Sequence, residues 1–233
     1  MAQSLAAAGM KITIVKDGPY QVTGAVPLLR ETIGANESGD SVDWVEGEAE
    51  RPRKAYQLCR CGHSATKPFC DGSHERVGFD GTETASRAPY DEQAGVMEGP
   101  ALALEDAESL CAFARFCDRD GNVWNTVSEV ASGGRREAFM RQVGQCPSGR
   151  LRVVVLENGK PVEPELPPSI ALVSDPAQGV AGPLWVRGEI EVVGSDGVAY
   201  EIRNRVTLCR CGASRNKPFC DGAHAGDEVR FQE

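Results

Sequence analysis

Six cysteines and two histidines form two copies of one short pattern in this chain. The first copy covers residues 59–74 and the second covers residues 209–224, and the two are identical at twelve of sixteen aligned positions. Such agreement indicates an internal repeat. Each copy has the spacing C-x-C-x8-C, with a histidine four residues after the last cysteine. Thiolates and imidazoles are ligands of transition metals, so each copy predicts one metal or cluster site.

Three thiolates and one imidazole satisfy two different kinds of centre. A structural zinc ion accepts a Cys3His shell. A [2Fe-2S] cluster accepts it as well, with two cysteines on one iron and a cysteine and the histidine on the other. The spacing favours the cluster, because zinc knuckles generally use C-x2-C pairs. Both centres remain open on the residues alone.

The fuller pattern C-x-C-x2-S-x3-P-x-C-D-G-[S/A]-H resembles the CDGSH iron-sulfur domain family, the mitoNEET-like proteins. The resemblance covers both motifs and the strands before them, roughly half of the chain. It implies a small fold with a β cap over a cluster-binding loop and a short helix, and two [2Fe-2S] clusters as cofactors. By the same resemblance the ligands of the cluster irons are Cys59, Cys61, Cys70 and His74 in the first copy and Cys209, Cys211, Cys220 and His224 in the second.

The repeat includes the approach to each motif. Residues 18–24 (Gly-Pro-Tyr-Gln-Val-Thr-Gly) resemble residues 182–188 (Gly-Pro-Leu-Trp-Val-Arg-Gly). Family members with a single motif form homodimers by pairing their β parts, so two motifs in one chain suggest an internal pseudo-dimer and a monomer in solution. The stretch between this turn and the motif is longer in the first copy, and we predict that the excess is a polar loop at residues 31–47 with Trp44 as its apolar anchor.

Hydrophobic periodicity and turn residues predict a β-rich α+β fold. Extended segments are predicted at residues 10–15, 20–29, 54–58, 151–156, 184–193 and 198–208, with an edge strand at 170–173. Asp71–His74 is predicted to form one helical turn, which would aim Cys70 and His74 at the same object. Helices are predicted at about 106–117 and 135–145. The predicted domains are a CDGSH module at 10–84, a small ferredoxin-like α/β middle segment at 85–178, and a second module at 179–233.

The middle segment has three cysteines of its own. Cys111, Cys117 and the Cys146-Pro147 pair are similar to the divergent ferredoxin-like domain with one [4Fe-4S] cluster that often accompanies CDGSH modules. Only three cysteines are available, and Phe113 stands where that domain often has a histidine. We therefore favour their interpretation as buried, small apolar residues on helix faces over a third cluster.

Four cations accompany the predicted ligands, namely Arg60, Lys67, Arg210 and Lys217. They either lie beside the anionic clusters or belong to a solvated loop surface. Asp71 and Asp221 are predicted to cap the ligand helices. His63 is predicted to be a surface residue, because alanine replaces it in the other copy.

The net charge of −9 argues against polyanionic partners, so we expect neither nucleic acid nor a membrane surface as the main partner. No apolar run approaches the roughly 20 residues that span a bilayer. The first ten residues carry no cation of a secretory signal, and we expect a cytoplasmic protein.

Two of the three histidines are committed as ligands and no phosphate-binding glycine loop is present, so we predict that the protein is not an enzyme. The predicted function is electron transfer or iron-sulfur cluster transfer to redox or cluster-acceptor proteins. A structural zinc-binding interaction module is the alternative.

Overall fold

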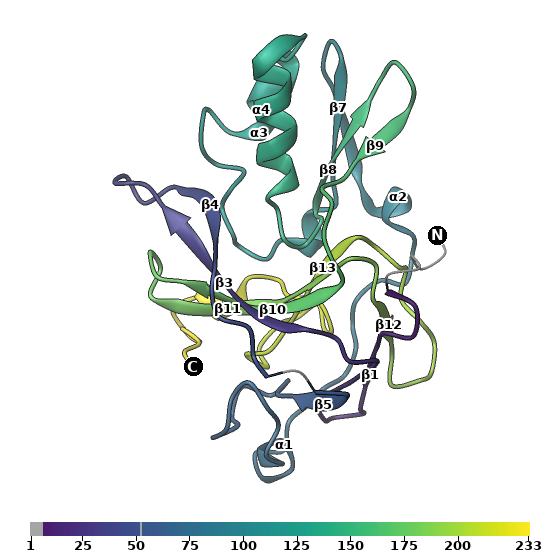
Figure 1. The fold of residues 1–233 in the computed structure, drawn as a ribbon, viewed down its shortest axis with the longest axis vertical. Helices are drawn as coiled ribbons and strands as arrows, with labels where there is room; N and C mark the ends of the chain where they lie inside the picture. The colour runs from purple at the N-terminus through teal and green to yellow at the C-terminus, as the bar shows by residue number, and fades with distance from the viewer. Residues whose placement is uncertain (1–6, 52) are drawn as a thin grey trace.

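A computed structural model describes residues 7–51 and 53–233 and arranges them in three β-sheets accompanied by a few helices (Figure 1). The first sheet has the order β12-β1-β2-β5, with β1 (Lys11–Ile14), β2 (Tyr20–Thr23), β5 (Ala55–Leu58) and β12 (Glu191–Val193). The second has the order β13-β11-β10-β3-β4, with β3 (Leu28–Ala35), β4 (Ser41–Glu46), β10 (Ser169–Asp175), β11 (Val180–Arg187) and β13 (Arg205–Leu208). The protein is therefore β-rich, as predicted.

These two sheets repeat one arrangement. Strands β1, β2 and β5 pair in antiparallel succession, and so do β10, β11 and β13. Each set also receives one parallel strand from the other half of the chain. Strand β12 pairs with β1, and β3 pairs with β10. The two halves thus exchange strands reciprocally.

One hydrophobic core joins the first two sheets. It includes Ile12, Val22 and Leu58 from the first sheet and Ile170 and Leu184 from the second, each no more than 1% exposed. Burial of apolar side chains is the main favourable contribution to folding, so the exchanged strands and this core hold the halves together.

The third sheet lies at one end of the molecule, beside the longest helix (Figure 1). Its order is β6-β7-β8-β9, with β6 (Gly95–Glu98), β7 (Leu102–Asp106), β8 (Leu151–Val155) and β9 (Lys160–Val162). Helix α4 (Gly133–Gly144) packs on this sheet through Phe139 and Val143. Buried Arg205 at the start of β13 donates to the carbonyls of Val143, Gly144 and Cys146 at distances of 2.6–3.0 Å. These bonds satisfy carbonyls at the end of α4 and connect it to the second sheet.

Short helical elements complete the described chain. They are α1 (Ser73–Arg76), α2 (Tyr90–Gln93), α3 (Val123–Thr126) and 3-10 turns at Glu108–Leu110, Val127–Glu129 and Ala223–Ala225. None of the helices among the described residues combines the length and the apolar character that crossing a membrane requires.

The predicted polar loop at residues 31–47 is wrong. Most of this stretch forms β3 and β4, joined by the turn at Asn36–Asp40. Glu31 is buried and makes an ion pair of 2.8 Å with Arg187, so a charged residue stands inside a strand. Trp44 is indeed an anchor, because it packs against an aromatic ring of β11 with 4.6 Å between centroids.

Two predictions for the middle segment are also wrong. In place of a helix at 106–117, the chain makes one 3-10 turn and then a loop in which Phe113 and Arg115 have φ angles of 59° and 61°. Arg115 instead forms an ion pair with buried Asp175. The predicted edge strand at 170–173 belongs to β10, which is the central strand of its five-stranded sheet and is buried along most of its length.

Other local predictions are confirmed. The helix predicted at 135–145 is α4, the strand at 151–156 is β8, and β8 and β9 form a hairpin around Asn158–Gly159. The predicted strands at 10–15 and 54–58 correspond to β1 and β5. The domain bounds at residues 84 and 178 stay a prediction, although β10 pairs with β11 of the second module.

Candidate metal centres

The potential metal ligands of the first motif form two pairs. Strand β5 leads directly into Cys59, whose Sγ lies 3.7 Å from that of Cys61. Helix α1 holds His74, with Nδ1 3.4 Å from the Sγ of Cys70. Two thiolates that bind one tetrahedral metal at about 2.3 Å lie about 3.8 Å apart. Each pair is therefore spaced to hold one metal atom.

The second motif repeats this geometry. Strand β13 leads into Cys209, whose Sγ lies 3.7 Å from that of Cys211, and Cys220 Sγ lies 3.4 Å from His224 Nδ1. Across the described ranges, no group of three or more Cys, His, Asp and Glu side chains is arranged to hold a single ion. The eight predicted ligands are thus brought together as four pairs.

The same polar contacts brace both ligand loops. Asp71 accepts hydrogen bonds from the backbone nitrogens of Ala65 and Ser73, and these bonds lower the pKa of its carboxyl. Asp221 accepts the equivalent bonds in the second motif. Each aspartate thus supports the turn before the ligand histidine, but the predicted helix caps are wrong, because Gly72 and Gly222 occupy the N-cap positions and no side chain caps either element.

The cations have structural partners. Lys67 and Lys217 each donate to a serine carbonyl of their own loop at 2.8 Å. Arg60 and Arg210 are 2% and 3% exposed, so they do not belong to a solvated surface. Arg210 donates to the carbonyls of Gly182 and Val173 and pairs with Glu233. These buried arginines hold the motifs against neighbouring strands and loops.

His63 is exposed, as predicted.

The two cysteine loops touch each other reciprocally. A Cβ placed on Gly62 would lie 2.5 Å from the carbonyl oxygen of Cys211, and a Cβ on Gly212 would lie 2.5 Å from that of Cys61. The φ angles of the two glycines are +81° and +83°, which side chains rarely adopt. Both features require glycine at these positions and bring the two motifs into backbone contact.

The surroundings of the two motifs differ. Cys220 and His224 are 2% and 4% exposed, whereas Cys70 and His74 are only half-buried. The loop around Phe113 covers the second motif, because a Cβ on Gly222 would lie 3.1 Å from the Phe113 Cβ. Burial, followed by the charge of Arg210, lowers the pKa of His224 to about 4.

Burial also affects the thiols. It raises the pKa of both Cys70 and Cys220, so metal binding must displace protons from neutral thiols. In the second motif the hydrogen bond between the first two cysteines lowers the pKa of Cys209 to about 6 and raises that of Cys211. One proton shared between neighbouring thiols accounts for these opposite shifts.

The three cysteines of the middle segment lie together. Cys111, Cys117 and Cys146 line one small cavity of about 20 Å³. None of them lies in an α-helix, so their predicted positions on helix faces are wrong. Burial raises the pKa of Cys117. The resemblance to the one-cluster ferredoxin-like domain implies such a convergence, whereas the favoured positions on helix faces do not.

Comparison with known families agrees with this arrangement. The model of a family described as iron-binding zinc finger, CDGSH type, matches residues 17–75 and 181–225. The model of a family described as divergent 4Fe-4S mono-cluster matches residues 97–156 between them. No curated protein and no solved structure matches the chain significantly. The chain is an iron-sulfur protein that belongs to the CDGSH family, with two CDGSH modules on either side of a divergent 4Fe-4S mono-cluster segment.

Proposed function

We propose that the protein holds two [2Fe-2S] clusters, one in each CDGSH motif, and passes electrons or whole clusters to other proteins. The observation that carries the proposal is the pairing of ligands. A [2Fe-2S] cluster has two irons, and each motif offers a Cys-Cys pair at 3.7 Å and a Cys-His pair at 3.4 Å. A single zinc ion would need all four side chains around one point, so the zinc module has less support.

The chain is proposed to be an internal pseudo-dimer that is monomeric in solution. Three features support this: the repeated antiparallel strands, the reciprocal parallel strands, and the mirrored contacts of Gly62 and Gly212. Together they give each motif the partner that a second chain would otherwise supply. Light scattering should give the mass of one chain, about 25 kDa, and an obligate dimer would contradict the proposal.

The first motif is the better candidate for contact with a protein partner. Its Cys70 and His74 are half-buried, whereas Cys220 and His224 lie beneath the loop around Phe113. A bound [2Fe-2S] cluster supplies one-electron redox chemistry. An electron carrier should undergo repeated reduction and oxidation without losing iron. A cluster donor should instead lose its visible absorbance when an apo-acceptor is added.

Metal analysis tests the proposal directly. Freshly purified protein is expected to be coloured and to contain about four iron and about four acid-labile sulfide per chain. Cys61→Ser and Cys211→Ser should each remove about two iron, because each breaks one ligand pair. His63→Ala is the matched control and should keep the full content, since His63 is an exposed residue of the same loop. A colourless protein containing stoichiometric zinc would contradict the proposal.

A third cluster is a second candidate, favoured by the cavity that Cys111, Cys117 and Cys146 share. Phe113 and Arg115 have positive φ angles between the first two cysteines. Backbone turns of this kind can direct N–H groups toward an anionic centre, as at many iron-sulfur sites. The match to the divergent 4Fe-4S family points the same way.

Iron content also separates the two candidates. With a third cluster the iron should rise to about seven or eight per chain, and Cys117→Ser should remove three or four. With buried apolar cysteines Cys117→Ser should leave the iron unchanged. Cys61→Ser serves as the control, because it should remove about two iron in either case.

A further inference from the structure

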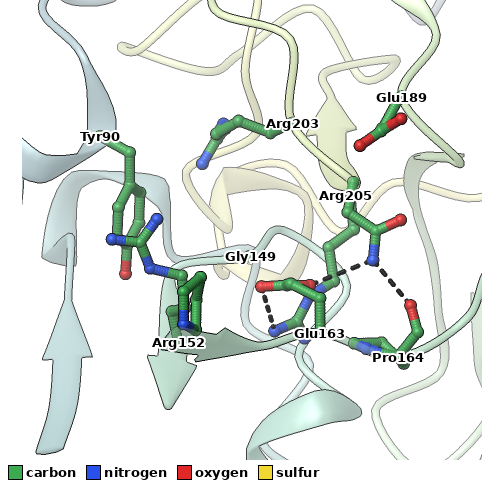
Figure 2. A pocket seen from close by; sticks show the side chains of 10 residues that line it. Tyr90, Gly149, Arg152, Glu163, Pro164, Glu189, Arg203 and Arg205 are labelled. Carbon is green, nitrogen blue, oxygen red and sulfur yellow. Dashed lines mark hydrogen bonds and ion pairs between the residues drawn. The ribbon is translucent and has the colours of Figure 1, made fainter. Parts of the chain in front are cut away.

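A cavity of about 350 Å³ lies between the third sheet and the segment that precedes the second motif. Figure 2 shows Tyr90 and Arg152 on one side, Arg203 and Glu189 across from them, and Pro164 at the edge. Small-molecule sites usually have volumes of about 300–1,000 Å³, so this cavity could hold a small ligand. It is separate from the proposed ligand pairs.

Two of the three arginines around the cavity are already neutralised. Arg152 pairs with Glu105 at 2.5 Å and also contacts Asp91. Arg205 pairs with Glu163 at 2.8 Å (Figure 2). Their charges are therefore compensated inside the protein and give no reason for a ligand to bind.

Arg203 differs from both. Its Nη1 is buried and has no hydrogen-bond partner, and within residues 7–51 and 53–233 the side chain forms no ion pair. It lies near the rings of Tyr90 and Phe219, with its guanidinium carbon 5.9 and 5.5 Å from their centroids. Burial lowers the pKa of Arg203 to about 10, so the side chain still carries its charge at neutral pH.

The charges of Glu201 and Glu163 act on Arg203 from a distance, but neither residue forms an ion pair with it. A largely buried cation that lacks a hydrogen-bonded anion is destabilising, and an anion that hydrogen-bonds to it removes much of that penalty. The guanidinium group matches a carboxylate, which can accept two parallel hydrogen bonds. Tyr90, Pro161 and Pro164 offer apolar surface for the rest of such a ligand. Glu163 and Glu189 on the same walls disfavour a ligand with two negative charges.

We propose that this cavity binds a small organic monocarboxylate, with the carboxylate held by Arg203 and the apolar body against Tyr90 and the two prolines. The site is independent of the clusters, so its failure would leave the proposed function intact. The chemistry of this site also differs from that of the two motifs, whose proposed metal ligands are thiolates and imidazoles.

The repeat provides a matched control. Arg53 and Arg203 both stand six residues before the first cysteine of their motif. Arg53 is exposed, and its guanidinium carbon lies 4.0 Å from the centroid of the Phe69 ring. Arg53 and Arg203 thus share a repeat position and an aromatic neighbour, but only Arg203 lines the cavity.

Calorimetric titration of the full chain with benzoate tests the site. Benzoate should bind to the wild type and to Arg53→Met with the same affinity. Arg203→Met should weaken binding at least about tenfold, because it removes a charged hydrogen-bond partner. On the wild type, benzamide should bind at least about tenfold more weakly than benzoate, since it keeps the ring and lacks the charge. That comparison needs no variant.

Thermal unfolding gives a second readout. With benzoate, only chains that keep Arg203 should gain stability. Equal affinity for benzoate and benzamide, absence of benzoate binding, or tighter binding of phosphate than of benzoate would each overturn the proposal.

Discussion

Gly62→Ala is expected to destabilise the protein by about 2–5 kcal/mol, a large share of the roughly 5–15 kcal/mol that stabilises a typical domain. Two effects combine. Alanine at a φ of +81° is strained by about 1–2 kcal/mol. The new methyl group would also lie 2.5 Å from the carbonyl oxygen of Cys211, and that oxygen belongs to backbone that can move only if the two cysteine loops separate.

The control for this prediction is Gly39→Ala. Gly39 has a φ of +85°, but no atom of the described residues lies within 4 Å of its Cβ position. It should therefore show the backbone strain without the steric clash. Urea unfolding, followed by the loss of visible absorbance and of secondary structure, measures the stability of both variants. If Gly62→Ala were no less stable than Gly39→Ala, the contact between the loops would not contribute to stability.

Gly212→Ala adds a test of reciprocity. Its Cβ would meet the carbonyl oxygen of Cys61 at the same 2.5 Å. If both substitutions open the same contact, the double variant should be less destabilised than the sum of the single variants. Strict additivity would mean that the two glycines act at independent places.

The pairing of the predicted ligands follows from the sequence, because it depends on local spacing. Cys70 and His74 are four residues apart and meet, although the helical turn predicted from Asp71 is wrong, because α1 begins only at Ser73, after Gly72 with a φ of 84°. Cys59 and Cys61 are two residues apart and converge in one loop. Such pairs need no information about the rest of the fold, and each recurs at the second motif.

The interactions that join distant parts of the chain were not predictable in this way. The hydroxyl of Tyr20 donates to the carbonyl of Cys209 at 2.7 Å, across 189 positions of sequence. Nothing near Tyr20 in the chain indicates that partner. The hairpin of β3 and β4 was missed for a related reason, because Glu31 is neutralised by Arg187 on a strand from the other half. Polarity indicates exposure only when a charge has no buried partner.

Acidification is expected to release iron from the first motif at a pH at least about one unit higher than from the second. Only the neutral imidazole can bind a metal. Burial lowers the pKa of His224 to about 4, so this histidine stays neutral until the solution is strongly acidic. His74 is less deeply buried than His224, and its Nε2 lies 3.9 Å from a carboxylate oxygen of Glu75.

The lowered pKa of His224 determines how the stability of the metal-free protein changes with pH. A histidine in the unfolded chain titrates near about 6.5, whereas His224 in the fold binds its proton only near pH 4. The neutral form therefore stabilises the fold at neutral pH, and in the metal-free protein this contribution is lost as the pH falls from about 6.5 towards 4. Solvent reaches His74 more readily than His224, so we expect the first loss of iron at the first motif.

Variants that keep only one intact motif allow each release of iron to be assigned to its motif. Cys211→Ser leaves the first motif intact, and Cys61→Ser leaves the second intact. The loss of iron from each variant is followed during a pH titration by visible absorbance in the presence of an iron chelator. His74→Cys should abolish the earlier phase, because a thiolate replaces the ligand that acid removes, while His224→Cys should leave that phase unchanged. Simultaneous release from both motifs, or earlier release from the second, would mean that the difference in burial between the two histidines does not control acid lability.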